Sequence, residues 1–69
     1  MKVKRGHKKV KSFLVENNIK QKEVAEVLGM SVPTFNKKLN GSMGADFHIG
    51  EARVMCLKYG IKPELFFDN

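Results

Sequence analysis

The sequence QKEVAEVLGMSVPTFNKKLNG, which spans residues 21–41, sets the architecture of this chain. Two short amphipathic stretches are separated here by about three residues, and the connection contains Gly29. A joint of this length makes two helices cross steeply. Because the chain must reverse at Gly29 with a positive φ that a Cβ resists, glycine suits the position. The segment is therefore predicted to form two helices packed across a tight turn.

The apolar residues of this segment have the spacing that fills the wedge between two crossed helices. Ala25 falls where the two backbones approach most closely, so a larger side chain would push them apart. Phe35 and Leu39 recur at i and i+4 and give the second helix one buried face. Ser31 is expected to cap that helix by accepting the N–H of Thr34. The other side chains predicted to be buried here are Val24, Val27, Leu28 and Met30.

Helical periodicity continues on both sides of this segment. Residues 8–17 carry apolar side chains at i, i+3 and i+4, and residues 49–59 carry another apolar stripe. Before the latter stretch, His48 and Glu51 have the spacing of a capping box. A last short helical turn is expected from Pro63. The stripe predicted for residues 49–59 consists of Ile49, Ala52, Met55, Cys56 and Tyr59.

These elements predict an all-α fold, a compact bundle of five short helices. Sixty-nine residues leave room for a single domain, which we place at residues 8–67 after a flexible basic arm at residues 1–7. The single cysteine, Cys56, excludes an intramolecular disulfide and indicates a reducing, cytoplasmic setting. The apolar runs are too short to predict a membrane span.

The sequence offers no arrangement of residues that supports catalysis. His7 and His48 lie in different segments, without metal-ligand spacing and without a neighbouring nucleophile. Neither a carboxylate pair nor a glycine-rich phosphate loop is present. We therefore expect a protein that is not an enzyme and that needs no metal, cofactor or small-molecule ligand.

The positive charge is concentrated at one end of the chain. The sequence has 13 Lys and Arg against 7 Asp and Glu, and six of the basic residues fall within the first eleven positions, where there is no acid. From Ser12 onward the two kinds of charge balance. A basic arm beside a neutral domain is typical of a protein that binds a polyanion, although a solubilising tail has the same composition.

The 21–41 segment resembles the helix-turn-helix of the phage repressor and Cro family. The resemblance covers roughly residues 8–67 and is greatest for the small Cro-like regulators of temperate phages and prophages. It implies a lambda-repressor-like DNA-binding domain that acts as a sequence-specific transcriptional regulator in a bacterial host cell, in the cytoplasm or with the nucleoid. The residues that carry it are Gln21, Ala25, Gly29, Phe35 and Asn40-Gly41.

The resemblance implies that the helix containing Phe35 lies in the major groove of DNA. The periodicity separately leaves a set of residues on the face of that helix that Phe35 and Leu39 do not use. Within this set Asn36 is suited to adenine and Lys37 to guanine, whereas ending the helix is an equal alternative for Asn40. The candidate base contacts are Val32, Pro33, Asn36, Lys37 and Asn40. The candidate phosphate contacts are Gln21, Lys20, Lys22, Thr34, Lys38, Lys2, Lys4 and Arg5.

Lys38 is a departure from the family pattern. Many members bury an aliphatic residue at this position, and Leu39 takes that role one step later here. The sequence therefore does not determine how the second half of this helix is rotated about its axis, nor whether Lys37 and Lys38 are exposed.

Two hypotheses about partners remain open. In the first, the chain is a homodimer on a palindromic operator in double-stranded DNA, with an interface at Val54, Leu57 and Phe67. In the second, the same fold is a protein-binding modulator, such as an anti-repressor, whose partner is a repressor protein. An antitoxin-like regulator is a third option, which also binds DNA.

Overall fold

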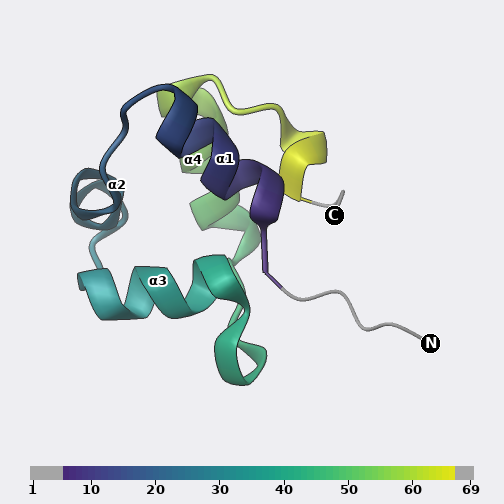
Figure 1. Cartoon of the computed structure of the whole chain (residues 1–69). Coiled ribbons are helices and arrows are strands. Elements are labelled where there is room, and N and C mark those ends of the chain that lie inside the picture. The colour runs from purple at the N-terminus through teal and green to yellow at the C-terminus, as the bar shows by residue number, and fades with distance from the viewer. Residues whose placement is uncertain (1–5, 67–69) are drawn as a thin grey trace.

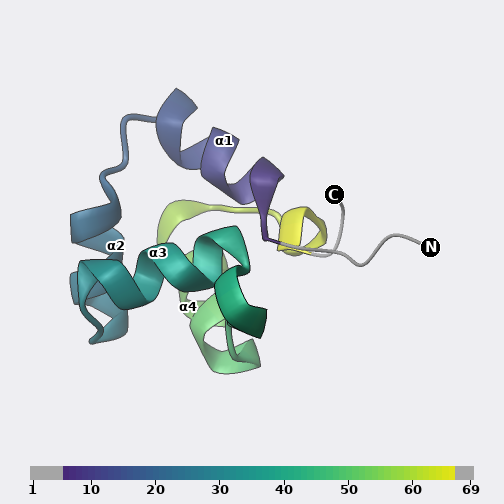
Figure 2. The same ribbon diagram turned by 60° about the horizontal axis from the view of Figure 1, so that its bottom comes forward.

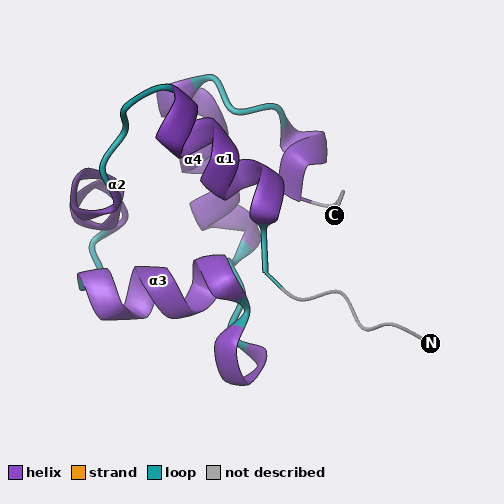
Figure 3. Ribbon diagram, viewed as in Figure 1, coloured by secondary structure: helices purple, strands orange, loops and turns teal. Residues whose placement is uncertain are grey.

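The computed structural model describes residues 6–66, and this part of the chain is helical without any strand (Figure 1, Figure 3). Five helices were expected, but the described residues form four α-helices and two short 3-10 helices. The turn that starts at Pro63 is one of these 3-10 helices, and the other lies in the connection before the last α-helix. The elements are α1 (Lys8–Glu16), α2 (Gln21–Leu28), α3 (Val32–Asn40), η1 (Ser42–Gly44), α4 (Ile49–Tyr59) and η2 (Pro63–Phe66).

The turn between α2 and α3 has the backbone that the sequence predicted. Gly29 ends α2 in the left-handed region with φ of 73°, and Met30 N–H then donates to the Ala25 carbonyl at 2.9 Å. Ser31 caps α3, because its Oγ accepts the Thr34 N–H at 3.3 Å. Three residues thus separate the two helices, and the polar groups at the start of α3 are satisfied locally.

Replacing Ser31 with alanine should lower the free energy of unfolding by about 1 kcal/mol. The substitution removes the acceptor for the Thr34 N–H and the donor to Thr34 Oγ1, which lies 2.9 Å from Ser31 Oγ. Urea unfolding followed by circular dichroism measures this loss. Ser12→Ala is the matched control, since Ser12 is exposed inside α1 and its substitution should not destabilise the domain. Equal unfolding midpoints for the two variants would contradict the capping role.

The core is a single cluster to which every α-helix contributes. Phe35 and Leu39 of α3 are 0% and 1% exposed, and α2 adds Val24 and Ala25 at the crossing point. The wedge between α2 and α3 is therefore filled as predicted, with Leu28 and Met30 partly buried against it. The remaining buried apolar residues are Val10, Leu14, Met55, Ile61 and Phe66.

Two residues expected in the core face outward instead. Val27 is 37% exposed on α2, and Ile49, the first residue of α4, is 86% exposed. The stripe of α4 was predicted one turn too long, because the core contacts of this helix begin only at Ala52 and centre on Met55. Ile49 instead lines a surface groove, which is described below.

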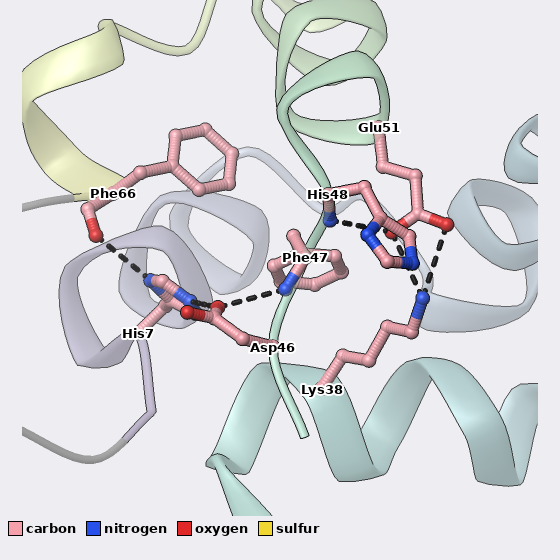
Figure 4. A network of polar contacts seen from close by, with 7 residues as sticks. All are labelled: His7, Lys38, Asp46, Phe47, His48, Glu51 and Phe66. Carbon is pink, nitrogen blue, oxygen red and sulfur yellow. Dashed lines mark hydrogen bonds and ion pairs between the residues drawn. The ribbon is translucent and has the colours of Figure 1, made fainter. Parts of the chain in front are cut away.

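The arm was expected to run through residue 7, but His7 belongs to the folded domain. The side chain is buried, and its Nδ1–H donates to the Phe66 carbonyl at 3.0 Å, while Nε2 lies 2.6 Å from Asp46 Oδ1 (Figure 4). The backbone N–H of His7 also donates to the Leu39 carbonyl at 2.8 Å. His7 therefore fixes the start of α1 to the end of α3, to the connection before α4, and to η2.

Candidate nucleic-acid interface

One face of α3 is open along the whole length of the helix. Figure 1 shows α3 along one edge of the molecule, and Figure 2, with that edge turned forward, shows α3 at the front. Phe35 and Leu39 point into the core, and the side chains on the opposite side of α3 point outward. All five candidate base contacts are exposed, namely Val32, Pro33, Asn36, Lys37 and Asn40.

Three side-chain amides connect the outer face of α3 to the start of α2. Asn40 Nδ2 donates to Asn36 Oδ1 at 2.9 Å, and Asn36 Nδ2 donates to Gln21 Oε1 at 3.0 Å. Gln21 is half-buried and is the first residue of α2. We call this set the amide chain. Each of these residues was predicted separately as a DNA contact, whereas their hydrogen bonds to one another were not predicted.

Lys38 is not among the outward-facing residues of α3. Its Nζ lies 2.9 and 3.0 Å from the two carboxylate oxygens of Glu51, and the two side chains are only 15% and 21% exposed (Figure 4). Glu51 also accepts the His48 N–H at 3.0 Å, as the spacing of the capping box predicted. The pair therefore fixes the second half of α3 to the first turn of α4. The ion pair holds the Lys38 ammonium, which was predicted to contact phosphate, against α4, and it fixes the rotation of α3 with Leu39 inward and Lys37 outward.

The environment of Glu51 lowers the pKa of its carboxyl group. Burial raises this pKa, but the hydrogen bond from the His48 N–H and the ammonium of Lys38 outweigh that effect. A carboxyl whose pKa is lower in the folded state stabilises the fold above its unfolded pKa, ordinarily 4.5, and the contribution disappears as pH falls through the folded pKa.

Glu51→Gln should therefore destabilise the domain near neutral pH and have a smaller effect in acid. The difference in unfolding free energy between wild type and variant is measured by urea unfolding between about pH 7 and about pH 3. In a Lys38→Met background the same substitution should show a weaker dependence on pH, because the ammonium is absent. A difference that stays constant over the range would contradict the role of the pair.

Of the candidate phosphate contacts, the described ones other than Lys38 lie near the start of α2 and in the first turn of α3. Lys20 and Lys22 are exposed beside Gln21 at the start of α2, and Thr34 is exposed but bonded to Ser31. Gly6 lies against the end of α3, since a Cβ there would be 2.9 Å from the Asn40 carbonyl oxygen. The arm residues Lys2, Lys4 and Arg5 lie outside the described residues, but the chain that carries them joins the domain at this point.

A separate apolar groove lies beside α4, bounded by η1 and η2. Its volume is about 930 Å³. Of the expected interface residues, Leu57 lines the groove and is 80% exposed, Val54 is 40% exposed and outside it, and Phe67 lies outside the described residues. Met43, which was not predicted as an interface residue, also lines the groove and is 95% exposed.

No protein-family model, curated protein sequence or solved structure matches this chain. Within residues 6–66, no helix has the length and the apolar content needed to cross a membrane. In the same part of the chain, no three His, Cys, Asp or Glu side chains gather as a metal site requires.

Proposed function

We propose that this chain is a sequence-specific DNA-binding transcriptional regulator, in which α2, the turn at Gly29 and α3 act as a helix-turn-helix. The observation that carries the proposal is the open face of α3, with exposed amide and ammonium groups in front and a fully buried Phe35 behind. A rigid helix held outward in this way has the shape that enters the major groove of DNA.

The side chains on this face have the chemistry needed to read base edges. An asparagine amide pairs with adenine through its oxygen and one N–H, and a lysine ammonium donates to guanine O6 or N7. Asn36 and Lys37 are adjacent and exposed near the middle of α3. Val32 and Pro33 present apolar surface in the first turn, which suits contact with a thymine methyl group.

The groups around this face support contacts with the DNA backbone on both sides of it. Gln21, Lys20 and Lys22 lie at the amino end of α2, where the helix dipole favours an anion. At the opposite end of α3 the chain enters from residues 1–5, which contain Lys2, Lys4 and Arg5. These contacts set affinity and register, whereas α3 sets specificity.

The groove beside α4 supports a second copy of this chain as the partner of the regulator. Met43, Ile49 and Leu57 line the groove and are 95%, 86% and 80% exposed, so a second copy packed there would cover exposed apolar surface. To bind a palindromic site, such a dimer must place its two copies of α3 about 34 Å apart. The same groove favours one alternative function, a modulator that binds a different regulator there and has only weak affinity for DNA.

Selection from a library of random duplexes at several salt concentrations tests the proposal. We expect enrichment of one short sequence, in palindromic form if the second copy occupies the groove. Retention that falls with salt but enriches no sequence would contradict the regulator and favour the modulator.

Deleting residues 1–5 should weaken binding to every duplex by a similar factor and reduce the dependence of affinity on salt. The deletion removes Lys2, Lys4 and Arg5, and removal of one phosphate contact lowers the slope of log affinity against log salt by about 0.9. Fluorescence anisotropy on the enriched duplex and on a scrambled duplex measures both quantities. A deletion that changes which sequence is enriched would assign base reading to the arm instead.

A further inference from the structure

We infer that His7 is a positioning residue that fixes the start of the basic arm against the end of α3, and that it does so only while its ring is an imidazolium. The inference rests on the proposed function and deepens it, because Lys2, Lys4 and Arg5 of the arm are proposed contacts with the DNA backbone. The affinity for DNA that the arm adds depends, on this account, on one proton of His7.

The backbone of Gly6 and His7 lies directly on the last turn of α3. The N–H of His7 donates to the Leu39 carbonyl at 2.8 Å. Gly6 has φ of 74°, and a Cβ on it would lie only 2.9 Å from the Asn40 carbonyl oxygen, so a larger residue would push the two segments apart. These contacts place the point at which residues 1–5 join the domain beside Asn40, at the end of the proposed recognition helix.

The side chain of His7 fixes this backbone in place. Its Nδ1 lies 3.0 Å from the Phe66 carbonyl oxygen, and its Nε2 lies 2.6 Å from Asp46 Oδ1 (Figure 4). The rings of Phe47 and Phe66 pack against it, with centroids at 5.3 and 5.6 Å, and the side chain is only 7% exposed. Because both nitrogens and the ring itself are engaged, a change at either nitrogen disturbs the position of residues 6 and 7.

The two polar partners of the ring require it to be an imidazolium. A backbone carbonyl accepts hydrogen bonds and does not donate them. The Asp46 side chain is 68% exposed and therefore ionised near neutral pH, and its Oδ1 also accepts the Phe47 N–H at 2.7 Å. Both ring nitrogens of His7 must thus carry a proton. A neutral ring has a single N–H, so one nitrogen would present a lone pair to an oxygen and that hydrogen bond would be lost.

Charged groups approach the ring from several elements. Asp46, in the connection before α4, favours the imidazolium through its direct hydrogen bond. Lys8 and Lys11 of α1 and Arg53 of α4 line cavities that His7 also lines, and their charges disfavour it. Among the described residues, α3 and η2 add no ionisable side chain to these cavities. Histidine changes its charge between about pH 5 and about pH 8, so we expect the contact of the arm with α3 to weaken as pH rises through this range.

The first test measures the arm factor, the ratio by which deletion of residues 1–5 weakens binding to the enriched duplex. In the otherwise unchanged chain, this factor should be about fivefold larger at about pH 6 than at about pH 8, which corresponds to the loss of one hydrogen bond. His7→Phe retains an aromatic ring but no ring nitrogen, so its arm factor should be small and the same at both pH values. An arm factor of the wild type that does not change with pH would overturn the inference.

His48→Asn is the matched control for these measurements. It removes the only other histidine of the sequence and supplies a residue that caps helices well. Its arm factor should change with pH as that of the wild type does. Thermal unfolding verifies that each variant is folded. A pH dependence that His48→Asn abolishes and His7→Phe retains would also overturn the inference.

An NMR titration of the free wild-type chain tests the role of His7 without DNA and without a variant. The ring ¹⁵N signals of His7 and the amide signals of Gly6 and Asn40 should change over the same pH range. In Asp46→Asn these amide signals should depend less on pH, because a side-chain amide offers either its oxygen to the imidazolium or its NH₂ group to the neutral ring. Amide signals of Gly6 and Asn40 that stay in place while the His7 ring loses its proton would overturn the inference. A wild type that selects no DNA sequence contradicts the proposed function, whereas this titration still decides whether His7 fixes the start of the arm.

Discussion

Phe35→Ala should lower the free energy of unfolding by about 3–5 kcal/mol, the largest loss that we expect from a single substitution. Phe35 is completely buried, and its ring centroid lies 5.5 Å from that of Phe47. Alanine would leave a cavity under α3 and remove the aromatic contact. Small domains have a total stability of roughly 5–15 kcal/mol, so this variant should be partly unfolded at 37 °C.

Urea unfolding at 10 °C and 25 °C measures the loss for Phe35→Ala. Val15→Ala is the matched control, because Val15 is 69% exposed on α1 and its truncation should change stability by less than about 0.5 kcal/mol. Phe35→Leu retains more of the buried volume and should give an intermediate result. Equal stabilities of the Phe35→Ala and Val15→Ala variants would contradict the placement of Phe35 in the core.

Lys37→Ala and Asn36→Ala should each weaken binding to the enriched duplex by about 1–3 kcal/mol, or roughly 5- to 150-fold. Each substitution removes donors from the open face of α3 without touching the core, since both residues are exposed. Selectivity should relax at one base pair for each variant, because a base contact discriminates only at its own position.

Anisotropy titrations and a repeated selection measure these two effects. Lys58→Ala is the charge-matched control, since Lys58 is exposed in the last turn of α4 and its loss should reduce affinity only slightly. If Lys37→Ala and Lys58→Ala weakened every duplex alike, Lys37 would be a phosphate contact and not a base reader.

The local features of the fold were predictable from the sequence. The bounds of α4, the left-handed Gly29 and the cap at Ser31 agree with the structure, because short-range spacing and turn chemistry determine them. The outward direction of Asn36 and Lys37 followed from the i, i+4 spacing of Phe35 and Leu39. Periodicity therefore predicted the candidate face of α3, whereas the rotation of its second half, which the sequence left open, is fixed by the ion pair of Lys38 with Glu51.

The remaining features depend on contacts between residues far apart in the sequence. Lys38 pairs with Glu51, 13 positions later, and His7 contacts Phe66, 59 positions later. Neither residue has a local pattern that reveals its partner, so Lys38 was read as a phosphate contact and His7 as part of an arm. The bond between Asn36 and Gln21 belongs to the same class, because it depends on how α3 crosses α2.

Mapping the contact surface by NMR tests the central claim most directly. Addition of the enriched duplex to the ¹⁵N-labelled protein should shift the amide signals of residues 32–40 and of Gln21 most strongly. The amide signals of the residues that line the groove beside α4 should change less. If the amide signals of α4 and η1 shifted most and those of residues 32–40 stayed unchanged, the proposal that the outer face of α3 contacts DNA would be contradicted.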